Sequence, residues 1–342
     1  MAPVLYNLGQ ILGVVFLASD GITLGPLHLP GMGLGVYGLV YGVIGGAALH
    51  LLIQVPGLLR YGFRWSPSLN LRHPAAVKVL VLMGPRVLSM LFLHIYFLAR
   101  DNLASHFPAG AVTILNYGWF IQQMPETLIG TAIAIALLPS LSEYLTRSQP
   151  DEFRDTINRA LRTMLALTLP AAALLGVTIQ PLAEAVFGFQ GADAVLLGWV
   201  TRAFLLGLLG HTWLEVAVRS FFAQQDALRP LAGALGNLLL YLALALTLPA
   251  WLGLGGLALA DTLAFTTQAL ALHWILNRRY PGTLRLGSTL PRTLGSAALG
   301  GAAAFLVMQI APGLWGAVGA LAAGGLACLP LIWPELRLLL RL

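Results

Sequence analysis

Long apolar segments constrain the fold of this chain more than any other feature. A helix needs about 20 apolar residues to cross the hydrocarbon core of a bilayer, and segments of that kind recur along the whole sequence. They cover residues 2–19, 33–55, 79–100, 110–138, 159–179, 195–222, 231–249, 254–276, 292–311 and 313–334. Only 9% of the 342 residues are charged, whereas soluble domains carry about 25%. The sequence therefore predicts an all-α, polytopic transmembrane helix bundle of about ten spans.

The distribution of basic residues predicts which loops face the cytoplasm. Most of the 19 lysines and arginines fall in the loops after the second, fourth, sixth and eighth apolar segments and in the C-terminal tail. Only Arg100 lies at the opposite edge of the membrane. Because short cytoplasmic loops carry an excess of Lys and Arg, we expect both termini to be cytoplasmic. The net charge of +6 then belongs to loops that face anionic lipid, and we expect no nucleic acid as a partner.

Residues 110–145 read as one long apolar helix that contains several polar side chains. Asn116, Gln123 and Glu126 lie inside it, and Pro125 directly precedes the glutamate. A carboxylate near the middle of a span costs about 2.5–3.5 kcal/mol unless it faces protein or water. A proline there removes a hydrogen bond and bends the helix. Two interpretations stay open: a bent helix that borders a transport pathway, and a packing helix whose Glu126 pairs with a neighbouring side chain.

Other ionisable residues within the spans are candidates for function because each must be paired or hydrated. Arg86, His94 and Asp101 fall within an arc of about 80° on one face of one helix. Glu215 and Arg219 are spaced i, i+4 with the acid first, which favours an ion pair within the helix. An arginine that faces a cavity suits an anionic ligand, and we assign that role to Arg86.

Two helix boundaries follow from local patterns. Residues 150–162 place Phe153, Ile157 and Leu161 at i, i+4 and i+8, which predicts an amphipathic helix along the cytoplasmic surface before the next span. The last apolar segment is expected to end at Pro334.

Motifs of enzyme chemistry are missing from the sequence. It contains no phosphate-binding GK[ST] loop, no HExxH motif and only one cysteine, Cys328. We therefore predict no enzyme activity, no cofactor and no metal site, and expect any transport either to be driven by an ion gradient or by the membrane potential, or to be facilitated. Three histidines in apolar surroundings are interpreted as hydrogen-bonded core residues: His50, His211 and His273.

Two consecutive stretches resemble a known family. GPRVLSMLFLHIYFLARDNLAS (84–105) and GAVTILNYGWFIQQMPETLIGTAIAIALLPSLSEYL (110–145) are similar to the seventh and eighth helices of the MurJ/MviN lipid II flippases. PVLYNLGQILG (3–13) resembles the fifth helix of that family, and VRSFFAQQDALRP (218–230) resembles the end of its tenth. These flippases belong to the multidrug/oligosaccharidyl-lipid/polysaccharide exporter superfamily.

The resemblance implies a fold and a function. Family members have fourteen helices, arranged as two six-helix lobes around a cationic cavity with two extra C-terminal helices. The implied substrate is an undecaprenyl-pyrophosphate-linked peptidoglycan precursor, lipid II, which is moved across the bacterial inner membrane by alternating access. The implied partners are this lipid substrate, membrane lipids, and a monovalent cation or a proton as coupling ion.

The resemblance also divides the chain and assigns roles. Residues 1–60 correspond to the last two helices of an N-terminal lobe, 61–78 to a cytoplasmic connector with Pro74 near a helix start, 79–280 to a six-helix C-terminal lobe and 290–342 to a two-helix extension. The expected substrate-binding residues are Arg86, Arg219, Gln123 and Asn116. The expected residues for gating or ion coupling are Glu126, Asp101 and Glu215.

Two departures from the family pattern leave other functions open. The first four helices of the family have no counterpart, and Trp119 and Phe120 stand where members carry an Asp-Arg pair. One alternative is a cation-coupled drug antiporter of the same superfamily. The other is a non-transporting or partial membrane protein that acts with a partner chain.

Overall fold

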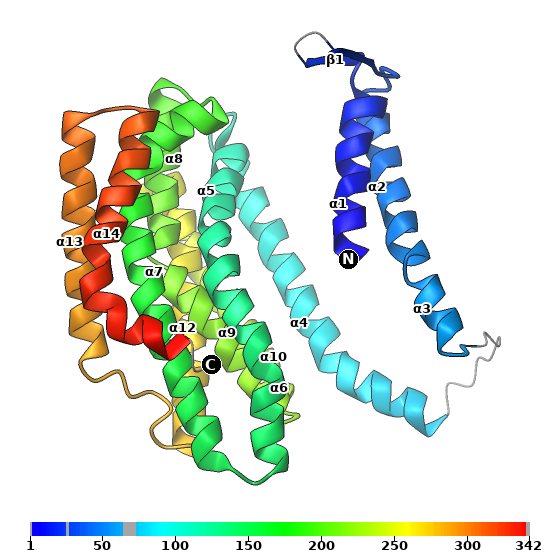
Figure 1. Ribbon diagram of the computed structural model, residues 1–342, viewed down its shortest axis with the longest axis vertical. Coiled ribbons are helices and arrows are strands. Elements are labelled where there is room, and N and C mark those ends of the chain that lie inside the picture. The colour runs from blue at the N-terminus through cyan, green and yellow to red at the C-terminus, as the bar shows by residue number, and fades with distance from the viewer. Residues whose placement is uncertain (1, 25–26, 64–72, 340–342) are drawn as a thin grey trace. The chain divides into compact units, whose positions relative to one another are not determined.

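The computed structural model describes residues 2–24, 27–63 and 73–339 of the chain (Figure 1). The chain divides into two compact units, Met1–His73 and Pro74–Leu342. Most of the predicted connector, residues 64–72, lies outside the described residues. The second unit opens on a helix that starts at Pro74, before the predicted end of the connector, because proline is well tolerated in a first helical turn.

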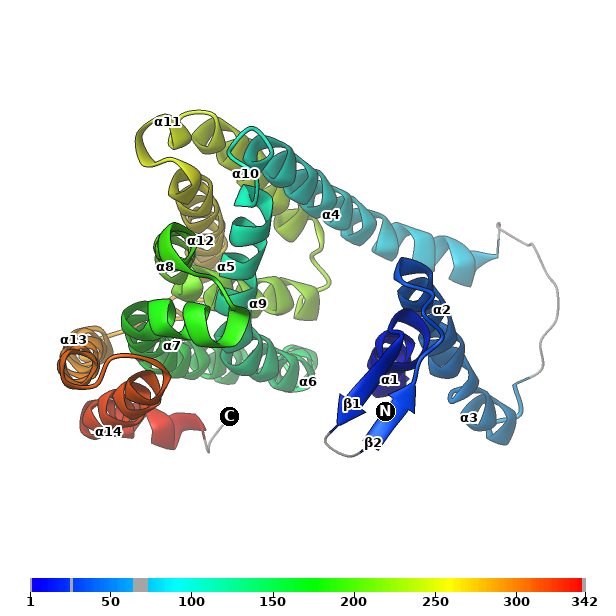
Figure 2. The same ribbon diagram turned by 90° about the horizontal axis from the view of Figure 1, so that it is seen from above.

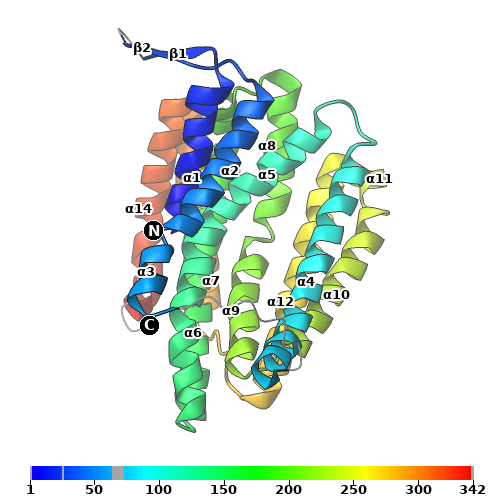
Figure 3. The ribbon, with the colours of Figure 1, turned by 90° about the vertical axis from the view of Figure 1, so that its right-hand side faces the viewer.

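The first unit is a helical hairpin with a small β-hairpin at its turn (Figure 3). Its elements are α1 (Ala2–Leu12), η1 (Gly13–Ala18), β1 (Gly21–Leu24), β2 (Leu27–Pro30), α2 (Val36–Leu52) and α3 (Val55–Arg60). Glycines let α1 and α2 approach closely, since a Cβ added at Gly9 would lie 2.6 Å from the backbone nitrogen of Gly46. The antiparallel strands are a local exception to the predicted all-α fold, and their pairing satisfies backbone groups outside the helices.

The second unit is entirely helical in its described residues. Its elements are α4 (Pro74–Ala104), α5 (Ala111–Pro125), η2 (Glu126–Thr131), α6 (Ala132–Thr146), α7 (Pro150–Phe187), α8 (Gly191–Leu205), α9 (Leu208–Ala223), α10 (Leu228–Ala245), α11 (Pro249–Leu252), α12 (Leu254–Arg279), α13 (Thr289–Ile310) and α14 (Leu314–Leu339). Seen from above, α13 and α14 lie side by side and both pack against α7 (Figure 2).

The prediction of a multi-pass helical membrane protein is confirmed. Among the described residues, 8 helical segments are long and apolar enough to cross a bilayer, and Val4–Ala18 is a shorter apolar helix. The eighth predicted segment, 254–276, forms α12, whose buried Asp261, Gln268 and His273 lower its mean hydropathy. About ten spans were predicted. The number of candidate spans is smaller because Val4–Ala18 is short and α12 is polar.

The predicted surface helix at 150–162 is wrong. Those residues begin the 38-residue helix α7, and Phe153, Ile157 and Leu161 are fully buried in the core of the second unit. Their i, i+4, i+8 spacing marks a face that packs against protein instead of lipid headgroups.

The final helix also departs from expectation, because α14 continues through Pro334 to Leu339. The residue after the proline, Glu335, is buried and bound by Arg292 at 2.7 Å and by Thr289 at 2.9 Å. These contacts hold the end of α14 against α13 and offset the hydrogen bond that proline removes.

Candidate functional site

The polar helix predicted at 110–145 is irregular at its centre. It consists of α5, the π-helical segment η2 and α6, and η2 begins directly after Pro125. Proline has no backbone N–H to continue the α-helical ladder, which explains why the hydrogen-bond pattern changes at this position. The sequence predicted a bend at Pro125, and the structure has a π-helical segment directly after it, with Glu126 as the first residue.

A second break lies in the span predicted at 195–222. That span consists of α8 and α9, which are interrupted at Leu206 and Gly207. Thr262 of α12 donates a hydrogen bond from its hydroxyl to the carbonyl of Ala203 at 2.7 Å and so helps satisfy the backbone at the break. Only a glycine fits there, because a Cβ at Gly207 would lie 2.7 Å from the Thr262 hydroxyl. Broken helices in membrane transporters commonly border binding sites.

A chain of buried polar side chains joins the two breaks. His211 of α9 has its Nε2 3.0 Å from Asp261 Oδ2 of α12, and its Nδ1 3.7 Å from Glu126 Oε2 of η2. Tyr96 of α4 donates its hydroxyl proton to Asp261 Oδ1. Gln122 donates from Nε2 to Glu126 Oε2 at 3.1 Å. Five helical elements, α4, α5, η2, α9 and α12, therefore meet through one line of hydrogen bonds and ion pairs.

The two carboxylates and the imidazole of this line, those of Glu126, Asp261 and His211, form what we call the carboxylate–histidine site. The side chain of Asp261 is 1% exposed and that of His211 is 5% exposed, whereas that of Glu126 is 15% exposed. The imidazole also stacks on Phe265, with ring centroids 4.2 Å apart. Access from outside the protein is therefore through Glu126.

The sequence interpretation of His211 was incomplete. It is a buried, hydrogen-bonded histidine, as expected, but its partners are two carboxylates. For Glu126 the structure shows pairing with a neighbouring side chain. Residues His211 and Asp261 are on different helices, so no local spacing in the sequence connects them.

A second cluster forms around Arg100, which the sequence analysis used only to mark the outer edge. Its side chain is 1% exposed, and its Nη2 lies 3.1 Å from Asp101 Oδ1 and also donates to Asn116 Oδ1. The guanidinium lies over the rings of Phe97 and Trp119. Arg100 thus brings together two predicted site residues, Asp101 and Asn116, that were expected to have different roles. A buried arginine next to an asparagine sixteen positions away has no sequence signal of its own.

The remaining predicted residues lie on α4, α5 and α9. The predicted ion pair within α9 is present, since Arg219 Nη1 donates to a carboxylate oxygen of Glu215. Arg86 is exposed on α4. Gln123 is partly buried on α5. Asp101 contacts Arg100, whereas Glu126 contacts Gln122 and His211, so Asp101 is not brought to Glu126.

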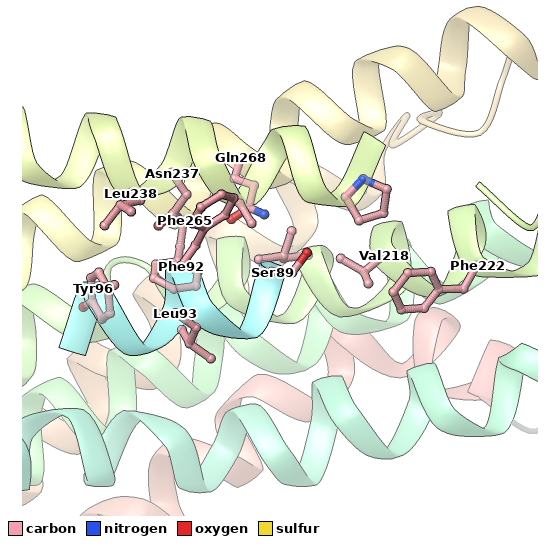
Figure 4. Close-up of a pocket in the computed structure, with 13 residues that line it drawn as sticks. Ser89, Phe92, Leu93, Tyr96, Val218, Phe222, Asn237, Leu238, Phe265 and Gln268 are labelled. Atoms are coloured by element: carbon pink, nitrogen blue, oxygen red, sulfur yellow. The ribbon is translucent and has the colours of Figure 1, made fainter. Parts of the chain in front are cut away.

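A cavity of about 160 Å³ separates α4, α9, α10 and α12 (Figure 4). Tyr96 lines one end of it, and Val218 and Phe222 of α9 line the other. Most of its wall is apolar, with Ser89, Asn237 and Gln268 among the polar residues. The cavity extends from the tyrosine that bonds Asp261 to the turn of α9 that carries Arg219.

Comparison with known proteins gives consistent matches. A family model described as lipid II flippase MurJ matches residues 1–324. The lipid II flippase MurJ of Burkholderia cenocepacia is 30% identical over 296 residues, which is 83% of this chain and 55% of that protein. The probable lipid II flippase MurJ of Rhizobium meliloti is 31% identical over 282 residues, covering 80% and 52%. The chain spans about half the length of these relatives.

Solved structures show the same fold. A lipid II flippase MurJ in an inward closed conformation superposes with a TM-score of 0.74 at 17% identity, covering 99% of this chain and 66% of that chain. The MATE transporter VcmN of Vibrio cholerae, in its bent form, gives a TM-score of 0.57 at 17% identity, covering 87% and 61%.

Proposed function

The chain belongs to the lipid II flippase MurJ family, and from that membership we propose that it moves a polyprenyl-pyrophosphate-linked saccharide across the bacterial inner membrane. The substrate on this proposal is the peptidoglycan precursor lipid II, and the movement is by alternating access. The observation that carries the proposal is the family match over residues 1–324. The family is one of transporters, not of catalytic enzymes.

Two arginines in the second unit support an anionic substrate. Arg86 on α4 is exposed, and the side chain of Arg219 on α9 is 19% exposed. Arginine side chains bind phosphate groups through charged hydrogen bonds, and a pyrophosphate can accept such bonds from both. Glu215 neutralises part of the charge of Arg219 in the absence of substrate. We propose that Asn116 and Gln123 on α5 add polar contacts.

Arg100 lies next to the position of one missing family feature. Trp119 and Phe120 replace the Asp-Arg pair of the resembling helix, and the guanidinium of Arg100 lies 5.7 Å from the ring centre of Trp119. A positive charge is therefore present beside this position, although it comes from α4. We propose that it stabilises the lobe through Asp101 and Asn116, because its side chain is almost fully buried.

The arrangement of lobes follows the same proposal. Residues 1–60 would form the end of an N-terminal lobe, 79–280 the C-terminal lobe, and 290–342 a two-helix extension that holds the lipid tail. A monovalent cation or a proton would drive the cycle, with Glu126 as the first acidic group it meets.

Complementation tests the proposal directly. The chain is expressed in a bacterium depleted of its own lipid II flippase, and growth and the lipid II content of the inner leaflet are measured. We expect the wild-type chain to restore growth and the double variant Arg86→Ala/Arg219→Ala to fail. A matched control, Arg147→Ala/Arg285→Ala, removes two exposed arginines and should restore growth.

The controls also define the contradicting results. Membrane insertion of every variant is checked by fractionation. Failure of an inserted wild-type chain to reduce inner-leaflet lipid II would contradict the proposed function. Full rescue by the Arg86→Ala/Arg219→Ala variant would remove both arginines from the substrate site.

A further inference from the structure

We propose that the carboxylate–histidine site binds a proton at Glu126 and that this proton weakens the contact between η2 and α9. The proposal identifies the coupling ion and its site. It rests on the proposed function only for its consequence for transport.

The position of His211 between two carboxylates favours its doubly protonated form. A neutral imidazole has one N–H, whereas both ring nitrogens of His211 face an acid, Asp261 at 3.0 Å and Glu126 at 3.7 Å. Only the imidazolium is attracted to both. With both acids ionised, the site carries one positive and two negative charges, and a net charge of −1 inside a membrane protein is costly.

Glu126 is the group that accepts a further proton. Its side chain is 15% exposed against 1% for Asp261, and its contact with His211 is longer. Asp261 already accepts a hydrogen bond from the hydroxyl of Tyr96, in addition to its contact with His211. A hydronium ion on the open side transfers its proton to Glu126 Oε2. One O–H bond of the hydronium breaks, one O–H bond forms on the carboxyl group, a water molecule leaves, and the charge of the site changes from −1 to zero.

Gln122 can serve both charge states of Glu126. Its Nε2 donates to the carboxylate at 3.1 Å, and its Oε1 is buried without a hydrogen-bond partner among the described residues. Rotation of the amide by half a turn presents this oxygen to the new O–H of a protonated Glu126. Gln122 can therefore form a hydrogen bond with Glu126 in both its neutral and its ionised form. A site whose charge never changes would need only one of these two arrangements.

Protonation changes the contact between two irregular helices. Glu126 is the first residue of η2, and His211 lies one turn after the break at Gly207, whose carbonyl accepts its N–H at 3.0 Å. The ion pair between Glu126 and His211 is a contact across this interface, and Gly130 packs closely on Thr212 beside it. Removing the charge of Glu126 removes the electrostatic attraction, so that η2 can separate from α9.

The surroundings favour a proton over a metal ion. The imidazolium repels a cation, and among residues 2–24, 27–63 and 73–339 no group of three or more His, Cys, Asp or Glu side chains is placed to hold a metal. The other titratable groups near the site are Tyr96 and Arg100 of α4 and Tyr241 of α10. In the described part of α6, α7 and α8, no side chain forms an ion pair with the three residues.

Infrared spectroscopy of the full chain in lipid nanodiscs tests proton binding. The band of a protonated, buried carboxyl group is followed as the pH is lowered. We expect the band to grow in the wild-type protein and in the control Glu143→Gln, which changes an exposed glutamate. We expect it to be lost in Glu126→Gln, whose amide keeps a hydrogen bond with Gln122. A band that persists unchanged in a folded Glu126→Gln protein overturns the proposal.

A second measurement does not depend on that variant. Nitrogen NMR of the histidine rings in the wild-type protein, with His211 assigned through His211→Asn, reports whether both ring nitrogens carry protons. We expect a doubly protonated His211 at a pH at which Glu126 is ionised. A neutral ring under those conditions overturns the proposal.

Transport assays separate this proposal from the proposed function. Flipping of lipid II in proteoliposomes is measured with a pH gradient in either direction. We expect the gradient dependence of the wild-type chain to be lost in Glu126→Gln and kept in Glu143→Gln. Proton binding without flipping at any pH rejects the proposed function and leaves the site standing. Flipping with the same gradient dependence in Glu126→Gln overturns the coupling.

Discussion

Tyr96 and Tyr241 lie edge to face with ring centroids 4.4 Å apart, yet only one of the two hydroxyl groups has a hydrogen-bond partner. Tyr96 donates to Asp261, whereas the hydroxyl of Tyr241 is buried without a partner among the described residues. Both rings are almost fully buried in the same hydrophobic cluster. Replacing each tyrosine in turn therefore distinguishes the contribution of a hydrogen bond to stability from the contribution of ring packing.

Tyr96→Phe should reduce stability and Tyr241→Phe should not. The first change removes a hydrogen bond to a charged group, and hydrogen bonds between helices in membranes are worth about 0.6 kcal/mol on average and about 1.7 kcal/mol at most. The second removes a buried hydroxyl that makes no bond, so its effect should be near zero or stabilising. Unfolding by detergent titration measures both free energies. An equal loss in the two variants would contradict the hydrogen-bond assignment.

The packing of α9 on α12 depends on small residues. A Cβ added at Gly210 would lie 2.7 Å from Thr266 Cα, so Gly210→Ala forces the two helices apart and should cost about 1–3 kcal/mol of unfolding free energy. Gly236 of α10 has open space where its Cβ would be, so Gly236→Ala should be neutral or stabilise by up to about 1 kcal/mol. Unfolding by detergent titration measures the free energy of unfolding of the two variants.

The same pair of variants tests the polar site. Because Gly210 directly precedes His211, separation of α9 from α12 should also lengthen the contact between His211 and Asp261. The histidine ring resonance of Gly210→Ala should then move towards that of a solvated histidine, and that of Gly236→Ala should stay at the wild-type position. An unchanged spectrum in Gly210→Ala would show that the helices accommodate the methyl group elsewhere.

Local patterns in the sequence predicted what depends on neighbours along the chain. The length of the apolar segments predicted the helices, and Pro125 predicted an irregularity at the position where η2 begins. The i, i+4 spacing of Glu215 and Arg219 predicted their ion pair. Each of these depends on residues within a few turns of one helix.

Contacts between distant residues were not predictable in that way. The bond between His211 and Asp261 requires α9 and α12 to pack at one register, and the contact of Arg100 with Asn116 requires the same of α4 and α5. The periodicity of Phe153 and its neighbours indicated one apolar face but not whether lipid or protein covers it, because both are apolar surroundings.

Glu335 should be important for holding α13 and α14, the C-terminal hairpin, against α7. Its carboxylate is 1% exposed, and Arg292 of α13 and Arg162 of α7 bind the same oxygen at 2.7 and 3.4 Å. Glu335→Ala leaves two arginines next to each other without their counterion, and breaking a buried pair costs about 3–5 kcal/mol. Because Arg162 and Arg292 are about one third exposed, water screens them and we expect the lower part of that range or less.

In Glu335→Ala, hydrogen exchange should increase in α14 and change little in α10. The matched control Glu184→Ala changes an exposed glutamate of α7 and should leave exchange in α14 unchanged. Equal protection of α14 in both variants would show that apolar packing of α13 and α14 against α7 holds the hairpin without the ion pairs.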